Sequence, residues 1–376
     1  MSARKTSFVL CGCLLLLLTS GCAEKKDTPN VGEALAAEQK SIGAQNNVQE
    51  QVPQRTAFNP RLLRRFKPLR ERFDAKGVEH NEARVELGRM LYYDTRLSKN
   101  HDVSCNSCHL LDAYGVDGKP TSSGHRAQRG DRNSPTVYNA AGYFAQFWDG
   151  RADTVEAQAM GPMVNPVEMA LPSPAIAEQT IRSIPQYREL FKEAFPETEE
   201  PITFVNIAAA IGSFERGLTT PSRWDQYLQG DKSALTDAEM EGLKVFTNIG
   251  CMVCHTGELL GGSMFEKVGV VEPWPNQEDP GRYAVTKHDA DTMMFKVPTL
   301  RNIAETAPYF HDGSVATLPE AVRFMGRHQL GLELTDQEIN AIVTWLKALT
   351  GPIPQDYIRK PELPPSTPTT PKPSPV

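Results

Sequence analysis

The sequence has 376 residues, with 40 Lys and Arg against 46 Asp and Glu, and therefore a formal net charge of −6 and a pI near 5.8. This length exceeds what one hydrophobic core usually serves, so it predicts two domains with appendages. The acidic balance, with no basic run longer than Arg64-Arg65, excludes a nucleic-acid partner.

Residues 1–22 have the pattern of a secretory signal peptide. An apolar run, Phe8–Leu18, follows two basic residues and is too short to span a bilayer as a stable helix. The end of this stretch resembles the bacterial lipobox, in which Cys22 would be acylated. An ordinary secretory signal that contains a cysteine is the alternative. Because Ala23 is not Asp, we expect a periplasmic protein whose only membrane contact is a lipid anchor in the outer membrane.

The chain between the leader and the end divides into four predicted parts. Residues 23–58 are polar, rich in Glu, Gln, Asn and Ala, and predict a flexible, disordered tether. Residues 59–232 and 233–355 would form two domains. Residues 356–376 are rich in Pro, Thr and Ser and predict a disordered, solvated tail that does not pack.

In the first domain, helices are expected on both sides of a long loop. The spacing of apolar residues predicts an amphipathic helix over 81–91 and further helices over 176–195 and 202–228. Residues 112–131 contain several Gly and Pro residues, and regular structure is not expected there.

In the second domain, two capping patterns mark helix starts. Thr236 and Glu239 predict a helix that leads directly to the second cysteine motif. Thr335 and Glu338 predict a terminal helix.

Two motifs with the pattern CxxCH carry the chemistry. Their residues are Cys105, Cys108 and His109 in the first and Cys251, Cys254 and His255 in the second. In a c-type haem site, the two thiols bond the porphyrin and the adjacent histidine ligates iron. Redox disulfides, half zinc sites or one four-thiolate zinc centre are the alternatives. Two such motifs in an exported chain favour two covalently bound haem c groups.

An internal repeat supports two related domains. Residues 133–139 are echoed by 296–302, and 147–150 by 310–313, both 163 residues later (296 minus 133; 310 minus 147). The two cysteine motifs are only 146 residues apart (251 minus 105). The second copy therefore carries a 17-residue insertion (163 minus 146) between its motif and the repeated block.

The order of the motifs resembles the bacterial di-haem cytochrome c peroxidase family, which includes the MauG branch. The order is CxxCH, a His sixteen residues on, FWDGRA, a Gln and a Glu ten apart, a second CxxCH, YFHDGS and a Met before QLG. The resemblance implies an all-α fold of two cytochrome c-like haem domains in tandem. It also implies reduction of hydrogen peroxide to water, with electrons from a small c-type cytochrome or a cupredoxin, and a possible homodimer.

The resemblance implies different sixth ligands for the two haems. Met325 would complete the haem of His255, which would receive electrons, whereas a core methionine is the alternative. The repeat places Pro162 at the position that matches Met325 (325 minus 163), so the first copy has no methionine there. Met160 and Met163 flank that proline and remain possible ligands.

His125, sixteen residues after His109, matches the distal ligand of the family's resting enzyme. It lies in the glycine-rich loop, and we expect that its withdrawal opens the iron to peroxide at low cost. A solvated loop histidine is the alternative. The remaining histidines are expected at the surface or in structural positions.

Three further residues match the family's catalytic positions. Glu168 would be the general acid and base, with a pKa raised by apolar surroundings, and Gln158 would orient peroxide or water. Trp148 would relay electrons between the haems. A solvated glutamate and a tryptophan that only packs are the alternatives.

The family also binds a structural calcium ion between its domains. The matching positions are Asn133, Thr306 and Pro308, the last two through backbone carbonyls, with several waters completing the shell.

Two rival functions stay open. One is a MauG-like enzyme that modifies a partner protein, which Met325 disfavours because MauG-type proteins lack that ligand. The other is a di-haem electron carrier without enzyme activity, in which Glu168 and Gln158 would have no role beyond structure.

Overall fold

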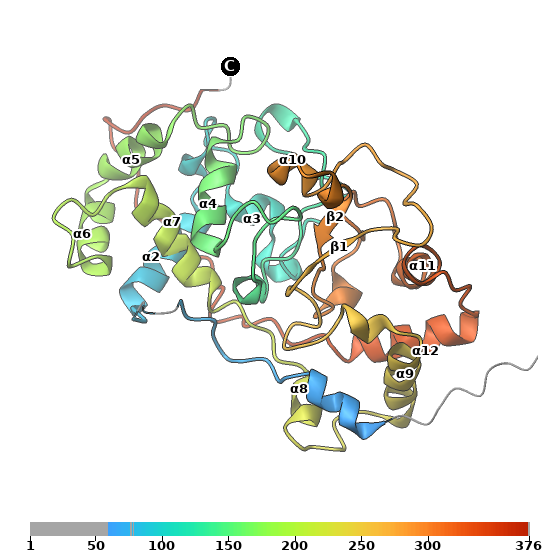
Figure 1. The fold of residues 1–376 in the computed structure, drawn as a ribbon. Coiled ribbons are helices and arrows are strands. Elements are labelled where there is room, and N and C mark those ends of the chain that lie inside the picture. The colour runs from blue at the N-terminus through green and yellow to red at the C-terminus, as the bar shows by residue number, and fades with distance from the viewer. Residues whose placement is uncertain (1–58, 76, 78, 375–376) are drawn as a thin grey trace, which may run out of the picture. The chain divides into compact units, whose positions relative to one another are not determined.

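Helices dominate the part of the chain that the structure describes (Figure 1). The structure is a computed structural model, and it describes residues 59–75, 77 and 79–374. The predicted signal peptide, lipid-anchor cysteine and tether lie outside those residues. No helix among the described residues has the length and apolar character needed to cross a membrane.

The helices occur in the following order. They are α2 (Glu82–Tyr93), α3 (Cys105–Cys108), α4 (Val155–Val164), α5 (Pro174–Arg182), α6 (Pro185–Ala194), α7 (Phe204–Glu215), α8 (Arg223–Leu228), α9 (Asp237–Asn248), α10 (Tyr283–Thr286), α11 (Leu318–Phe324) and α12 (Asp336–Lys347). A π-helical turn, Met325–Gln329, follows α11, and short 3-10 turns lie between several helices.

The described residues contain one two-stranded antiparallel sheet. It pairs β1 (Phe265–Lys267) with β2 (Met294–Lys296), and Phe265 lies opposite Lys296. The prediction of a helix-rich fold is confirmed. The predicted all-α class, however, did not include this small sheet. Strands of three residues are too short for an alternating pattern to reveal them.

Capping residues begin several helices as expected. The side chain of Asn81 accepts a hydrogen bond from the backbone of Arg84 at the start of α2. The capping boxes of Thr236 and Thr335 are both formed, at the starts of α9 and α12.

Two predicted long helices are each broken in the structure. The helix predicted over 176–195 is split into α5 and α6 at Pro185, and the helix predicted over 202–228 is split into α7 and α8, with Pro221 in the gap. Proline lacks a backbone N–H and its ring clashes with the preceding turn, so α5 cannot continue through Pro185. Pro221 likewise excludes one continuous helix over 202–228, although α7 already ends at Glu215, six residues before it.

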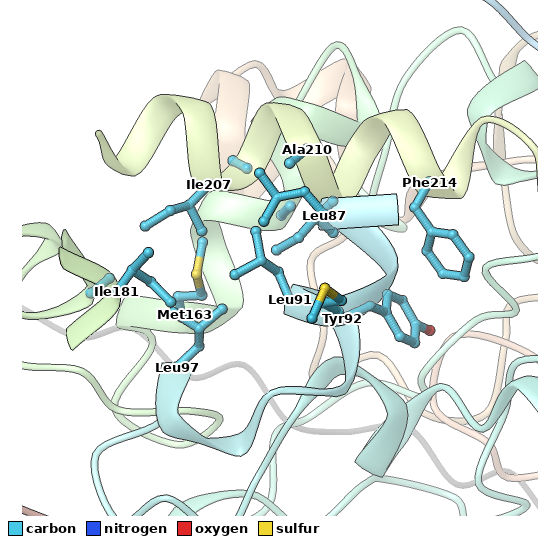
Figure 2. Close-up of a cluster of buried hydrophobic side chains, with 14 of the residues drawn as sticks. Leu87, Leu91, Tyr92, Leu97, Met163, Ile181, Ile207, Ala210 and Phe214 are labelled. Atoms are coloured by element: carbon cyan, nitrogen blue, oxygen red, sulfur yellow. The ribbon is translucent and has the colours of Figure 1, made fainter. Parts of the chain in front are cut away.

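In the first half, α2 packs across α7, with Leu87 of α2 beside Ala210 of α7 (Figure 2). A Cβ atom on Gly88 would lie 1.8 Å from the carbonyl oxygen of Ala210, so only glycine permits this close approach. Around the crossing, Leu87, Leu91 and Ile207 are fully buried in one hydrophobic cluster. This cluster lies beside α3, which carries the first cysteine motif.

The second half repeats this arrangement with α9 and α12. A Cβ atom on Gly242 would lie 2.1 Å from the carbonyl oxygen of Ala341. A second hydrophobic cluster surrounds the crossing, with Leu243, Phe246 and Trp345 among its buried members. In each half the helix that precedes a cysteine motif therefore packs on a later helix. The division into domains at residue 232 stays a prediction.

The backbone confirms the internal repeat. Isolated β-bridges join Gln146 to Ala152 and Tyr309 to Val315, at positions 163 residues apart. The helices α4 and α11 also begin at equivalent positions, each with a threonine cap whose side chain accepts a backbone hydrogen bond.

Equivalent residues of the two copies exchange hydrogen bonds. The backbone N–H of Asn133 donates to the carbonyl of His311 at 2.8 Å, and that of Lys296 donates to the carbonyl of Trp148, also at 2.8 Å. Asn133 matches Lys296 in the repeat, and Trp148 matches His311. Such reciprocal contacts are typical of a two-fold relation, here inside one chain.

The prediction of a disordered, unpacked C-terminal tail was wrong. Tyr357 stacks on Phe214, with ring centres 5.2 Å apart, and Ile358 is buried in the first hydrophobic cluster. Further on, Arg96 donates to the carbonyl of Pro364, and buried Thr370 bonds to Ser183 near the end of α5 (Figure 1). Proline-rich chain is already extended and loses little entropy when its carbonyls are bound by side chains.

Candidate functional site

The first cysteine motif forms one turn of helix and the residue after it. Cys105 and Cys108 are the ends of α3, three residues apart and hence on the same face. The backbone N–H of His109 donates to the carbonyl of Cys105 at 3.0 Å, which places the imidazole beside the turn. Neither cysteine forms a disulfide.

The second motif has the same geometry. The backbone N–H of His255 donates to the carbonyl of Cys251 at 3.1 Å, and Cys251 and Cys254 form no disulfide. No group of three or more His, Cys, Asp or Glu side chains capable of holding a metal ion occurs among the described residues. The four cysteines, all of which are described, therefore do not form one zinc centre.

The environment of the thiols is apolar rather than electropositive. Burial raises the pKa of Cys105 and Cys108, and it raises the pKa of Cys251 to about 12. A redox-active CxxC pair needs the opposite, a thiol pKa lowered by nearby positive charge or a helix N-terminus. The raised pKa values fit cysteines that line an apolar pocket.

The two motif histidines are oriented in the same way. Nδ1 of His109 donates to the carbonyl of Gly115 at 3.4 Å, and Nδ1 of His255 donates to the carbonyl of Leu260 at 3.0 Å. Burial lowers the pKa of both imidazoles, so their neutral forms dominate at neutral pH. A neutral imidazole whose Nδ1 is held by a carbonyl presents Nε2 to a metal. The residues of both motifs thus fit a covalently attached haem.

His125 and Glu168, which lie 43 residues apart in the sequence (168 minus 125), are brought together. The backbone N–H of His125 donates to the carbonyl of Glu168 at 2.7 Å. Gly124 lies so close to the same segment that a Cβ atom there would be 2.2 Å from the carbonyl oxygen of Val167. The loop of His125 is therefore held against the Glu168 turn, and withdrawal of His125 would have to break these contacts.

The side chain of His125 fits a metal ligand. It is only 4% exposed, and its Nδ1 is buried with no hydrogen-bond partner in the described part of the chain. A buried imidazole nitrogen without a partner is unfavourable unless an absent group binds the ring.

Glu168 has the electrostatics expected of an acid and base. It is half-buried, and its Oε1 accepts a hydrogen bond from the side chain of Asn165 at 2.8 Å. Burial raises the pKa of Glu168, against the opposing influence of Arg151 and Asn165. The carboxyl group can therefore bind a proton more readily than an exposed glutamate does.

Gln158 lies on α4, whereas Glu168 lies in the turn that follows this helix. The backbone N–H of Met169 donates to the carbonyl of Pro162, which folds that turn back onto α4. Between residues 79 and 374, no hydrogen bond joins the side chains of Gln158 and Glu168. The structure thus places both on one supersecondary unit without a direct bond.

Trp148 joins the two halves of the chain. Its indole N–H donates to the carbonyl of Asn133 at 2.9 Å, and its own carbonyl accepts from the backbone of Lys296. The ring packs against the second hydrophobic cluster, although Trp148 belongs to the first copy of the repeat.

The expected calcium ligands lie on two segments that meet. The side-chain N–H of Asn133 donates to the carbonyl of Lys119 at 3.0 Å, which leaves its oxygen for a cation. Thr306 and Pro308 precede His311, whose carbonyl accepts from the backbone of Asn133. Oxygen donors of this kind suit calcium.

Met325 begins the π-helical turn after α11 and is half-buried. Single π-turns in helices often occur at functional positions. Because α4 and α11 begin at equivalent positions, the structure also places Pro162 at the site that matches Met325.

Sequence reasoning missed an ion cluster beside Trp148. Arg132 donates to Asp149 at 2.6 Å and to both oxygens of Asp279, at 2.6 and 2.8 Å. Asp149 follows Trp148 directly, and Asp279 comes from the longer segment between the second cysteine motif and the repeated block. The aspartate of the repeated block was the available signal, but its partners come from distant parts of the sequence.

The chain is similar to known di-haem proteins. A family model described as "Di-haem cytochrome c peroxidase" matches residues 82–233. The cytochrome c551 peroxidase of Nitrosomonas europaea is 49% identical over 78% of this chain and 86% of its own. That of Pseudomonas aeruginosa is 44% identical over 86% and 94%. A crystal structure of a MauG-like protein associated with microbial copper homeostasis superimposes with a TM-score of 0.70, at 32% identity, over 81% and 99%.

Proposed function

The chain belongs to the di-haem cytochrome c peroxidase family, and from that premise we propose how its residues divide the work. It is an oxidoreductase that reduces peroxide with electrons from a cytochrome. In our proposal, the half around His109 and His125 carries out the peroxide chemistry, and the half around His255 and Met325 receives the electrons.

Haem attached at each motif would supply the iron that binds peroxide and passes electrons. His109 and His255 would hold the two haems through their Nε2 atoms. Met325 would add a thioether ligand in the second half, which favours the reduced state of iron. His125 would be the corresponding ligand in the first half, and its withdrawal would have to break the backbone bond to Glu168.

Glu168 then moves protons. Its carboxylate would accept the proton of one peroxide oxygen. It would then donate this proton to the other oxygen, which departs as water. Two electrons and two protons turn one peroxide molecule into two water molecules. Gln158 orients the substrate, and Trp148, bonded to both halves, lies on the electron path.

The observation that carries this proposal is the backbone hydrogen bond between His125 and Glu168. It holds the proposed removable iron ligand, His125, next to the proposed acid and base, Glu168. The test is peroxide turnover of Glu168→Gln with a reduced c-type cytochrome as donor. We expect a loss of roughly 100-fold or more, the usual contribution of a general acid and base. Glu189→Gln, an exposed glutamate on α6, is the matched control.

Turnover of Glu168→Gln at the wild-type rate would contradict the assignment of Glu168. The pH dependence adds a second readout. Because the carboxylate must accept the first proton, wild-type turnover should fall as the pH drops through the raised pKa of Glu168, and the variant should lack this step.

We also propose a calcium ion held by Asn133 and by the carbonyls of Thr306 and Pro308. The amide orientation of Asn133 and its bond to His311 support this site. Chelation of calcium should lower turnover and the unfolding temperature together, and Asn133→Leu should make the protein insensitive to the chelator.

The same proposal covers the setting of the enzyme. A cupredoxin could replace the cytochrome as donor, Cys22 would carry a lipid anchor in the periplasmic leaflet of the outer membrane, and the protein would form a homodimer. Mass spectrometry of the mature N-terminus, turnover with each donor and sedimentation analysis test these three points separately.

A further inference from the structure

Lys296 is a buried cation without an anion. It ends β2, and the residue is only 5% exposed. Its Nζ lies 3.6 Å from the centre of the Tyr143 ring. Over residues 79–374, no carboxylate forms an ion pair with this ammonium, and burial alone accounts for its lowered pKa of about 7.

An ammonium group in this position needs a partner. Lysine is almost never fully buried unless it is paired, because removal of its charge from water is very unfavourable. The face of the Tyr143 ring attracts the cation but does not neutralise it. The site therefore lacks a negative group that the polypeptide does not supply.

The surroundings of Lys296 indicate which group is missing. Its backbone donates to Trp148 of the first copy, and two residues later Pro298 influences the pKa of the His255 imidazole through its backbone. The carbonyl of Val297, the residue after Lys296, accepts from the backbone of Gly262 in the segment that follows His255. Lys296 thus lies at the end of the strand that leads into the haem-binding segment.

We propose that the ammonium of Lys296 binds a propionate of the haem attached at Cys251 and Cys254. The inference rests on the haem attachment proposed above. Propionates are the anionic groups of haem, and an ion pair in an apolar site satisfies both charges. Lys296 is then a positioning residue that fixes the haem beside Trp148.

The repeat shows that only the second copy has a lysine for this ion pair. The position equivalent to Lys296 in the first copy is Asn133, a neutral residue whose amide is bonded to Lys119. A fixed positive charge beside one haem disfavours loss of an electron from it. The ion pair therefore raises the potential of the His255 haem relative to the other, in the direction that electron entry requires.

The test uses Lys296→Met in the full haem-loaded chain. Midpoint potentials of both haems come from an optical redox titration, and the propionate bending modes come from resonance Raman spectra. We expect the potential of the Met325-ligated haem to fall, the potential of the other haem to stay, and one propionate mode to shift. Lys267→Met is the matched control, because Lys267 ends the partner strand β1 but is exposed.

Unchanged potentials and unchanged Raman modes in Lys296→Met would overturn the proposal, and so would a shift confined to the haem of His109. A pyridine haemochrome count separates this failure from a failure of haem attachment. Two haems with unaltered spectra refute only the ion pair, whereas one haem per wild-type chain refutes the attachment itself.

Lys296→Gln keeps a polar stem and serves if the methionine variant does not fold. The wild-type protein offers a third readout, because a paired propionate stays ionised to lower pH than a solvated one. We expect one propionate mode to hold its frequency while the others shift during acid titration. A common shift of all modes would refute the pairing.

Discussion

Asn139 and Asn302, at equivalent positions of the repeat, both donate from their side-chain amides to the hydroxyl of Thr220, at 2.9 and 2.8 Å. Both asparagines have left-handed backbone angles, with φ of 61° and 58°, and both precede a 3-10 turn. Their side-chain oxygens accept backbone bonds from Thr220 and Gly351. Thr220 therefore joins the matching turns of the two halves.

Replacement of Thr220 by valine should destabilise the fold. The side chain is fully buried, and valine keeps its shape but leaves two amide donors without an acceptor. Each unsatisfied buried group costs about 1–3 kcal/mol, so we expect a loss of roughly 2–4 kcal/mol in the free energy of unfolding. Denaturant titration of Thr220→Val measures this loss.

Thr180→Val is the control for this prediction. Thr180 is equally buried, but its hydroxyl has no hydrogen-bond partner among the residues described. Its replacement should be neutral or stabilising. Equal effects of the two substitutions would show that Thr220 does not act through its hydrogen bonds.

Local patterns predicted much of the fold, because their signals lie within a few residues. The cysteine motifs and the capping boxes at Thr236 and Thr335 are of this kind. The breaks of two helices were missed although Pro185 and Pro221 were visible, since apolar spacing continued across them. The repeat also paired Pro162 with Met325, but the matching helices α4 and α11 that carry this pairing were not predicted.

Contacts between distant residues were not visible in the sequence. Arg96 and Pro364 are 268 residues apart, and no pattern in either segment predicts their hydrogen bond. The backbone bond between His125 and Glu168 depends on how the first copy folds, and the burial of Lys296 depends on how the two copies pack. The disordered tail was predicted from composition alone. Composition does not show which distant residues a segment packs against.

Glu215 should make stability depend on pH. Burial, and then repulsion from Glu156, raises the pKa of Glu215 to about 8. The folded state therefore binds a proton that the unfolded state releases above its ordinary carboxyl pKa. This contribution is fully present below the unfolded pKa and is lost as the pH rises through about 8.

Glu215→Gln should remove that dependence. At about 1.4 kcal/mol per pKa unit, the variant should gain several kcal/mol over the wild type at pH 9 and little at pH 5. Urea titrations at both pH values measure the difference. Glu193→Gln, an exposed change on α6, should show no such gain, and a pH-independent effect of Glu215→Gln would contradict the prediction.

The C-terminal segment should stabilise the first half of the chain. Truncation after Pro361 removes the bond from Arg96 to Pro364, the packing of Leu363 and the bonds of Thr370. Hydrogen bonds to charged groups contribute about 1.5–3 kcal/mol, so we expect a loss of roughly 2–4 kcal/mol. Thermal unfolding measures it.

A shorter truncation, after Pro373, provides the control for the C-terminal segment. It removes the backbone bond from Ser374 to Lys99 but keeps the contacts of Pro364 and Thr370. We expect an unfolding temperature close to that of the full chain. If truncation after Pro361 had as little effect, the packing of this segment would not contribute to the stability of the fold.

Met325→His should lower the reduction potential of the haem held by His255. Thioether ligation raises the potential relative to imidazole ligation, and axial ligands set haem potentials over a range of ~0.8 V. We expect a decrease on the order of 0.1 V, and slower turnover if electrons enter at that haem as proposed. An optical redox titration measures the potential. Met240→Leu, half-buried on α9, should leave it unchanged, and an unaltered potential in Met325→His would remove Met325 from the ligand set.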